Sequence, residues 1–212
     1  MHIITKKVTL KPAPFVGTTI RVVLDDPASL TWGMYNLDLA EGRERAVIDW
    51  GDGTQTELTE SGEAIHAYAS TGAYEVRMSD DIETIQCSVF GSSSDYRRIY
   101  APMIREFRST SVNLTKIDSL CFCGAANLQT FACNGSGVVI LGSRAFAACT
   151  SLVGRLDLPG VKELSANTFM DALGITELQF SKANEATITA LPAWDASNHN
   201  FGATNAVCKF DL

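Results

Sequence analysis

The sequence predicts a mainly β protein, with a small N-terminal β-sandwich followed by a short solenoid that carries a ladder of parallel strands. Two observations predict this. Residues 1–80 contain short strand-like runs separated by turns, and residues 82–180 contain an apolar pattern that recurs at a nearly constant interval. We therefore expect a sandwich over 1–80 and a repeat domain over 81–212, with rungs at about 82–180 and a C-terminal cap over 181–212.

Composition limits the classes of partner. The 212 residues are 46% hydrophobic and carry a net charge of −7, which permits a buried core and disfavours nucleic acid, because an acidic surface repels phosphates. No segment approaches the roughly 18 apolar residues of a membrane span, so we expect no membrane insertion. The first 14 residues lack an apolar core of signal-peptide length. We expect no export signal in this sequence, and the localisation stays open.

The first half is divided into strand-like runs by turn residues. In two of them the apolar residues alternate, at Ile20 and Val22 and at Tyr74, Val76 and Met78, as strands with one buried face require. Two small sheets packed face to face would bury these stripes. The expected strands are IITKKVTL, TTIRVVLDD, SLTWGMYNLDL, RAVIDWGDGT, EAIHAYAS and AYEVRMSD.

The densest local signal is the segment 47–54, VIDWGDGT. Asp-Gly between two strand-like runs predicts a hairpin turn, and Trp50 is large enough to anchor a small core. The motifs H-x-Y at 66–68 and G-x-Y-x-V at 72–76 follow it. In this order the three motifs resemble the PKD (polycystic kidney disease) domain over roughly residues 10–80, and the resemblance implies an immunoglobulin-like sandwich.

Two polar groups in this segment have alternative interpretations. Asp49 and Asp52 could ligate Ca²⁺ near the tight turn, or their carboxylates could simply bond the backbone of the turn. We favour turn chemistry, since Ca²⁺ takes six to eight oxygens and only two acids are close here. His66 could be read as a catalytic base, but the resemblance implies a structural residue.

The second half repeats an apolar pattern. Five runs begin with an apolar residue and carry a second one at the fourth place; in the fourth run the second apolar residue comes one place later. The runs begin at Ile82, Ile104, Leu128, Leu152 and Ile175, at intervals of 22, 24, 24 and 23 residues. Phe122, Phe146 and Phe169 keep a second register, at intervals of 24 and 23. The period and the L-x-x-L-x-L pattern are typical of leucine-rich repeats. The stretch 145–152, AFAACTSL, resembles the BspA-type leucine-rich repeat, and this resemblance covers roughly 82–180.

Stacked rungs would form a parallel sheet whose alternate side chains point to solvent. The expected outward residues are Thr84, Gln86, Glu106, Arg108, Thr130, Ala132, Arg155, Asp157, Glu177 and Gln179. The candidate ligand-binding residues on this ladder face are Glu106, Arg108, Thr130, Arg155, Asp157, Glu177 and Gln179. The alternative is a solvated charge ladder whose members pair with one another. We expect the last rung to be covered by Leu191, Trp194, Phe201, Val207 and Phe210.

No pattern of catalysis or metal binding is found. Cys121-x-Cys123 with Cys133 and Cys149 has the wrong spacing for zinc, and the repeat explains the cysteines, Cys87 included, as buried fillers. The three histidines lack a nucleophile motif, and no Gly-rich phosphate loop occurs. We therefore expect no enzyme, no cofactor and no metal. The run Tyr96–Tyr100 mixes arginines with aromatics, and we read it as a solvated loop instead of a nucleic-acid site.

The two resemblances together imply a surface or appendage protein. Our sequence-based hypothesis is a non-enzymatic binding or adhesion protein of a bacterial cell surface or of a phage or prophage particle. It would recognise a protein or glycan through the ladder face. The alternatives are a purely structural spacer and, less favoured, a hydrolase.

Overall fold

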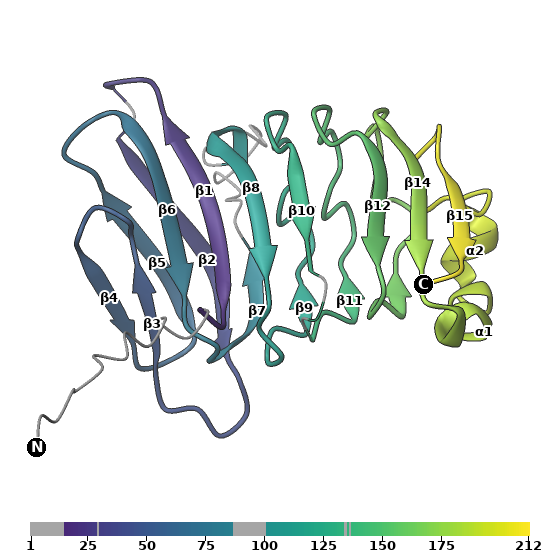
Figure 1. Ribbon diagram of the computed structural model, residues 1–212, viewed down its shortest axis with the longest axis horizontal. Helices are drawn as coiled ribbons and strands as arrows, with labels where there is room; N and C mark the ends of the chain where they lie inside the picture. Colours follow the sequence, from purple (N-terminus) through teal and green to yellow (C-terminus); the bar gives the residue numbers. More distant parts are fainter. Residues whose placement is uncertain (1–14, 29, 87–100, 134, 136) are drawn as a thin grey trace, which may run out of the picture.

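The computed structural model describes residues 15–28, 30–86, 101–133, 135 and 137–212. The protein is mainly β, as predicted, with three sheets and a few short helical segments near the C-terminus (Figure 1). The run IITKKVTL, which the sequence predicts as a first strand, lies outside the described residues.

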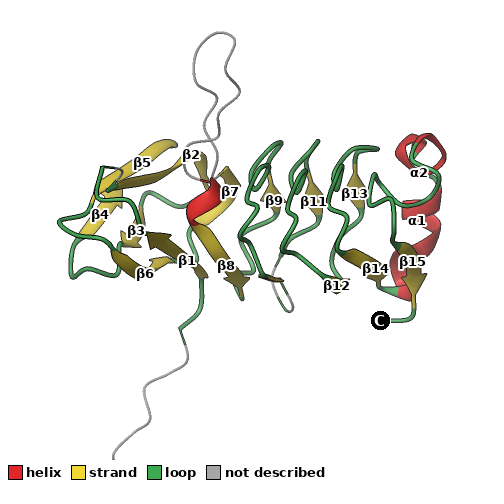
Figure 2. Ribbon diagram, turned by 90° about the horizontal axis from the view of Figure 1, so that it is seen from above, coloured by secondary structure: helices red, strands yellow, loops and turns green. Residues whose placement is uncertain are grey.

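Two six-stranded sheets face each other along most of the molecule (Figure 2). The front sheet has the order β10-β8-β1-β6-β3-β4, and the back sheet has the order β13-β11-β9-β7-β2-β5. A third sheet, β12-β14-β15, continues the front side and is entirely parallel. The strands are β1 (Thr18–Leu24), β2 (Thr31–Leu39), β3 (Ala46–Asp49), β4 (Gln55–Leu58), β5 (Gly62–Ala67), β6 (Gly72–Met78), β7 (Ile82–Gln86), β8 (Ile104–Ser109), β9 (Lys116–Ile117), β10 (Thr130–Ala132), β11 (Ile140–Leu141), β12 (Gly154–Leu158), β13 (Glu163–Leu164), β14 (Ile175–Phe180) and β15 (Val207–Phe210).

The N-terminal strands follow the predicted alternation. In β1, Ile20 and Val22 are fully buried while Arg21 between them is exposed, so one face packs inward. Trp32 and Trp50 meet edge to face in this core, with ring centroids 6.3 Å apart. The hairpin turn predicted at Asp-Gly is present: it joins β3 to β4, which pair antiparallel, so the run 45–54 comprises β3 and the turn.

Both large sheets cross the expected boundary at residue 80 without a break. On the front side β8 pairs antiparallel with β1 and parallel with β10, and on the back side β7 pairs antiparallel with β2 and parallel with β9. Each sheet therefore changes from antiparallel to parallel at this point. The N-terminal strands and the C-terminal coils consequently share one hydrogen-bonded framework.

Side chains reinforce this junction. Asp80, after β6, accepts hydrogen bonds from the Ser111 hydroxyl and, at 3.4 Å, from the Asn113 backbone. On the back side Gln86 accepts from the Asn36 side-chain amide and donates to the Ser119 carbonyl at 2.9 Å. Asn36 has φ +46°, and Gln86 is 5% exposed, so the bonded pair fixes an irregular point of β2 against the first coil.

The C-terminal part is a stack of coils in which the chain alternates between the front and back sides. Phe122, Phe146 and Phe169 form the predicted column inside it, with successive ring centroids 5.2 and 5.3 Å apart. Phe131, from a front strand, lies edge-on against Phe146 at 4.7 Å. Backbone bonds join the coils at the same level, for example from the Phe122 N–H to the Ala145 carbonyl at 2.7 Å.

The sequence predicted that the run at Ile82 lies on the same face as the later rungs, and this prediction is wrong. β7 lies in the back sheet, where Thr84 is opposite Lys116, whereas the runs at Ile104 and Leu128 lie on the front. Thr84 and Gln86 are accordingly 6% and 5% exposed and do not belong to the ladder face. Front and back strands both bury apolar residues at the first and fourth places, so the pattern alone does not separate them.

The C-terminal end is closed by η2 (Lys182–Asn184), α1 (Glu185–Thr189), α2 (Pro192–Ala196) and β15 (Figure 1). Phe201 is fully buried, and Trp194 packs against Phe201 and Phe210 at 5.7 and 5.9 Å, as predicted. Val207 was predicted to join them and does not. It is 57% exposed, because the segment is a further strand beside β14 and Val207 lies on its outer side, opposite Glu177.

Cysteines fill the interior of the coils, as predicted. Cys121, Cys123, Cys133 and Cys149 are buried, and the Cys149 thiol donates to the Phe122 carbonyl at 3.1 Å. Cys208 on β15 is half-buried, and burial raises the pKa of its thiol to about 12. Cys87 lies outside the described residues.

We predict that Phe146→Ala lowers the free energy of unfolding by about 3–5 kcal/mol, because it removes a ring that contacts three other rings in the interior of the coils. Urea denaturation followed by circular dichroism measures this. Val153→Ala is the matched control, since Val153 is 65% exposed, and its effect should stay within about 0.5 kcal/mol. Equal effects of the two substitutions would contradict a continuous aromatic column.

Candidate binding face

The outward side chains of the front side form a surface rich in charge, which we call the front face. It runs from β3 through β6, β1, β8 and β10 and continues over β12, β14 and β15 (Figure 1). The ladder-face candidates lie on it, and so do residues of the N-terminal strands that sequence reasoning did not connect with them.

Glu106, Arg108 and Thr130 lie where the repeat register predicts. Thr130 is opposite Glu106 on the neighbouring parallel strand, and Ala132 is opposite Arg108. The same rows continue across the junction, where Glu106 is opposite Arg21 of β1. Glu106 pairs with Arg21 at 3.3 Å and with Arg108 at 3.3 Å. These pairs are solvent-exposed, so each contributes little to stability.

Arg155, Asp157 and Glu177 form a second group. Arg155 is opposite Glu177, as predicted, and bonds both Asp157 and, at 3.7 Å, Glu177. Lys209 of β15 lies 2.6 Å from the other oxygen of Glu177. The bond to Asp157 raises the pKa of Arg155 and the bond to Glu177 raises the pKa of Lys209, so both cations keep their charge. The group alternates charge along and across its strands.

Gln179 does not face solvent, contrary to the prediction. It has no exposed surface, and its amide donates to the Asp211 carboxylate. The reason is β15, which places Lys209 directly opposite Gln179 and brings Asp211 over it. The amide oxygen of Gln179 is buried without a hydrogen-bond partner among the described residues. Gln179 is therefore a covered residue between two strands and is not accessible to a ligand.

The two groups of candidates are separated by a break in the hydrogen bonding. β10 belongs to the front sheet and β12 begins the third sheet. Gly154, at the start of β12, has φ +79°, and the register between β12 and β14 shifts here, since Gly154 is opposite Ile175 and Arg155 is opposite Glu177. The structure thus brings Glu106, Arg108 and Thr130 together, brings Arg155, Asp157 and Glu177 together, and keeps the two groups on different sheets.

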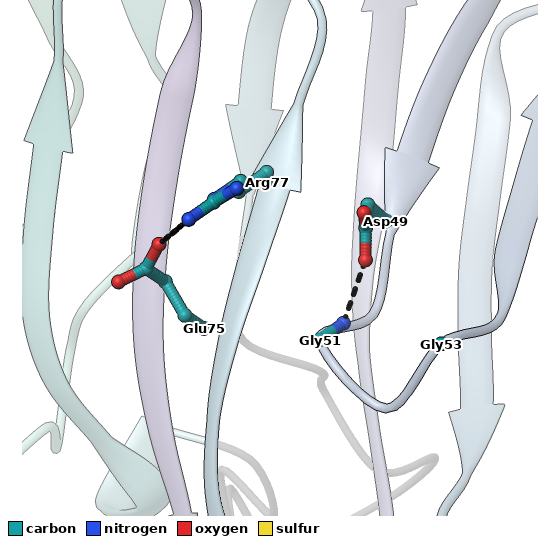
Figure 3. A pocket seen from close by; sticks show the side chains of 5 residues that line it. All are labelled: Asp49, Gly51, Gly53, Glu75 and Arg77. Carbon is teal, nitrogen blue, oxygen red and sulfur yellow. Dashed lines mark hydrogen bonds and ion pairs between the residues drawn. The ribbon is translucent and has the colours of Figure 1, made fainter. Parts of the chain in front are cut away.

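Shallow hollows lie on the front face beside the first group. One, of about 330 Å³, is lined by Asp49, Glu75 and Arg77 together with Gly51 and Gly53 (Figure 3). In it Arg77 points to Glu75, at 2.6 Å, while Asp49 accepts a hydrogen bond from the Gly51 backbone. Gly51 has φ +80°, and a Cβ there would lie 2.7 Å from the Glu75 carbonyl, so the turn packs directly on β6.

Two further hollows extend from Arg77. One, of about 250 Å³, reaches Arg108 and Thr110, and the other, of about 260 Å³, reaches Gln55. Phe15 lines both, with its ring 5.9 Å from the Arg77 guanidinium and 46% of its surface exposed. Sequence reasoning missed Phe15 and Arg77. Arg77 alternates with buried residues, as exposed residues of many strands do, so its position in the sequence carries no special signal. No local sequence pattern indicates that Phe15 lies beside Arg77.

In the WGDGT turn the aspartate carboxylates form hydrogen bonds with other groups of the protein. Asp52 accepts hydrogen bonds from the Thr54 hydroxyl at 2.6 Å and from the Thr54 backbone at 3.0 Å. His66 Nε2 lies 2.7 Å from the second oxygen of Asp52, and its ring stacks on Trp50 at 5.0 Å. The bonds from Thr54, with a smaller contribution from His66, lower the pKa of Asp52 to about 2. These contacts fit the turn interpretation of Asp49 and Asp52 and the structural interpretation of His66.

Tyr68 completes this cluster. Its hydroxyl donates to the Trp50 carbonyl at 3.2 Å, and its ring meets the edge of His66 at 4.5 Å. Burial raises the pKa of the Tyr68 hydroxyl. The motif residues of the PKD resemblance, Trp50, His66 and Tyr68, are thus in mutual contact.

Comparison of the chain with protein-family models, with curated proteins and with solved structures gives no match.

In the described part of the chain no group of three or more His, Cys, Asp or Glu residues is placed to hold a metal ion. No helix in that part is long and apolar enough to cross a membrane. The run Tyr96–Tyr100 lies outside the described residues.

We predict that Asp52 makes the free energy of unfolding depend on pH in the acidic range. Since its pKa is lowered in the folded protein, the stabilisation is present above the ordinary aspartate pKa of about 4 and is lost as the pH falls toward 2. With allowance for solvent screening, the loss is about 1 kcal/mol. Urea denaturation at pH 5 and pH 2.5 measures it. Asp52→Asn should be less stable than the natural protein at pH 5, with a smaller difference at pH 2.5; a pH-independent difference would contradict the assignment.

Proposed function

We propose that this chain is a non-enzymatic binding or adhesion protein that recognises a protein or glycan ligand through the front face. The observation that carries the proposal is the charged front face itself, on which Arg108 and Arg155 have side chains 58% and 49% exposed. An open hollow lies beside the first of these residues. Exposed arginines and an aromatic ring around shallow hollows are groups that commonly contact a bound ligand.

The architecture behind this proposal has two parts. We propose a PKD-like, immunoglobulin-like sandwich over residues 1–80 and a short BspA-type leucine-rich-repeat solenoid over residues 81–212. The contacts among Trp50, His66 and Tyr68 support the first, and the parallel pairing of β8 with β10 and the column of Phe122, Phe146 and Phe169 support the second. Proteins with such modules are found on bacterial surfaces and phage particles, and we propose the same setting for this chain.

A spacer function is the second candidate, and the ion pairs favour it. Glu106 is shared by two arginines, and Arg155 and Lys209 converge on Glu177. A face whose charges are paired internally offers less to a ligand than one with unpaired charges. If the protein is a spacer, reversing the charge of Arg108 and Arg155 leaves every binding and assembly property unchanged.

The test is a ligand screen with the full chain. Immobilised protein would be exposed to a glycan array and, separately, to proteins of the cell or particle from which the chain comes. We expect at least one ligand whose affinity falls about tenfold or more in the double variant Glu106→Gln, Arg155→Gln, because the ligand loses two charge-assisted contacts.

The matched control is Lys116→Gln. The Lys116 side chain on β9 is 38% exposed and pairs with Asp118 at 2.9 Å, so it resembles the front-face cations in its pairing but lies on the back sheet. This variant should bind like the natural protein. Absence of any ligand above background, or equal loss in the control, would contradict the proposal, and unchanged binding in the double variant would favour the spacer.

A further inference from the structure

The hollow between Arg77 and Arg108 brings two guanidinium groups together on the front face, each paired with a glutamate of its own strand. In the register of the front sheet, Arg77 of β6 and Arg108 of β8 are both opposite Thr19 of β1. Neighbouring strands lie about 4.8 Å apart, so the two arginines flank a single threonine at a spacing of about 10 Å. Both side chains point outward, and they are 51% and 58% exposed.

Each arginine keeps one nitrogen available. Glu75 bonds Arg77 through Nε and Nη2, and Glu106 bonds Arg108 through the same two atoms. The Nη1 groups have no protein acceptor among the described residues. The two glutamates lie toward one side, two residues back on each strand, and hold the guanidinium groups by Nε and Nη2, which leaves each Nη1 open to a further acceptor.

The other side of the hollow carries no acid. It is formed by Phe15, Gly17 and Thr110. A Cβ at Gly17 would lie 2.3 Å from the Met78 carbonyl and 2.7 Å from the Phe15 ring, and the φ of +148° is one that other residues rarely adopt. Gly17 therefore allows the β6 backbone and the Phe15 ring to pack closely against it. The Thr110 hydroxyl supplies a further polar group at the rim.

The adjoining hollows extend the surface with neutral and acidic hydrogen-bonding groups. Arg77 is common to all three hollows, and beyond it lie Asp49, Gln55 and Ser79. The floor is a flat sheet face and not a free strand edge or an apolar groove, which are the usual docking sites of extended and helical peptides. A chain of sugar rings suits such a surface, because its hydroxyls bond amides and carboxylates and its C–H faces pack on an aromatic ring.

We propose that this site binds an acidic saccharide, with the sugar carboxylate held between Arg77 and Arg108 and the ring face packed on Phe15. Guanidinium groups with outward N–H donors match a carboxylate, and Phe15 is exposed beside them. Neighbouring sugar units lie in the hollow lined by Asp49 and Gln55. The inference rests on the proposed function and names its ligand class, but it places the contact on the N-terminal part of the front face.

The experiment is calorimetric titration of the full chain with tetragalacturonate, a hyaluronan tetrasaccharide and 3′-sialyllactose. The methyl ester of tetragalacturonate is the matched ligand that lacks only the charge, and a glutamate decapeptide supplies carboxylates without sugar rings. We expect at least one acidic saccharide to bind, and neither the ester nor the peptide to bind comparably. Raising the salt concentration should weaken the interaction.

Three variants locate the site. Arg77→Gln and Phe15→Ser should each weaken binding about tenfold or more, and Lys116→Gln should leave it unchanged. Phe15 precedes the first strand of the front sheet and is exposed, so its variant tests the site even if Arg77→Gln disturbs the sheet. Thermal unfolding of each variant verifies that the fold persists.

The outcomes separate this inference from the broader proposal. If no acidic saccharide binds, or if the peptide binds as tightly, the saccharide site is wrong; the proposed function still stands if another ligand is lost with Glu106→Gln, Arg155→Gln. If saccharide binding is lost with Phe15→Ser and retained with Arg155→Gln, the saccharide site is supported and the C-terminal group is not part of it. Loss of binding only in Arg155→Gln would overturn the inference.

Discussion

The pairing of β8 with β1 and of β7 with β2 is the constraint on which the rest of the structure depends. A stack of coils exposes apolar surface at its first turn, and a sheet exposes unpaired backbone groups at its edge. Here the N-terminal sheets cover the apolar surface of the first coil, and the first coil pairs with the backbone groups at the sheet edges. The outer strands of the N-terminal sheets bond to the first front and back strands of the coils, and Ile104 and Ile85, on those two strands, are fully buried.

The same pairing creates the candidate binding face. Arg77, Thr19 and Arg108 come from three strands, and they lie in one row only because β8 bonds to β1 in a fixed register. A slip of one residue would turn Arg108 inward and Phe107 outward, which the buried Phe107 ring forbids. The chemistry of the face is therefore a consequence of how the core packs at the junction.

The far end is closed by different means. β15 adds a last parallel strand to β14, while Trp194 and Phe201 cover the aromatic core from the side. This addition removes Gln179 from the surface and gives Glu177 a second cation, Lys209. Closure of the stack and pairing of its charges are thus coupled, because the strand that closes the last coil also supplies Lys209 to Glu177.

The sequence by itself determined the recurrence of buried apolar residues in the first strand and along the coils. The alternation in β1 and the spacing of Phe122, Phe146 and Phe169 by 24 and 23 residues both follow from burial, and the opposite positions of Glu106 and Thr130 follow from the same period. Only the tertiary structure decided that the run at Ile82 belongs to the back sheet, that Gln179 is covered, and that Phe15 lies over Arg77. The physical reason is that periodicity records the side on which a residue is buried, whereas neighbours across a sheet are set by contacts between residues far apart in the chain.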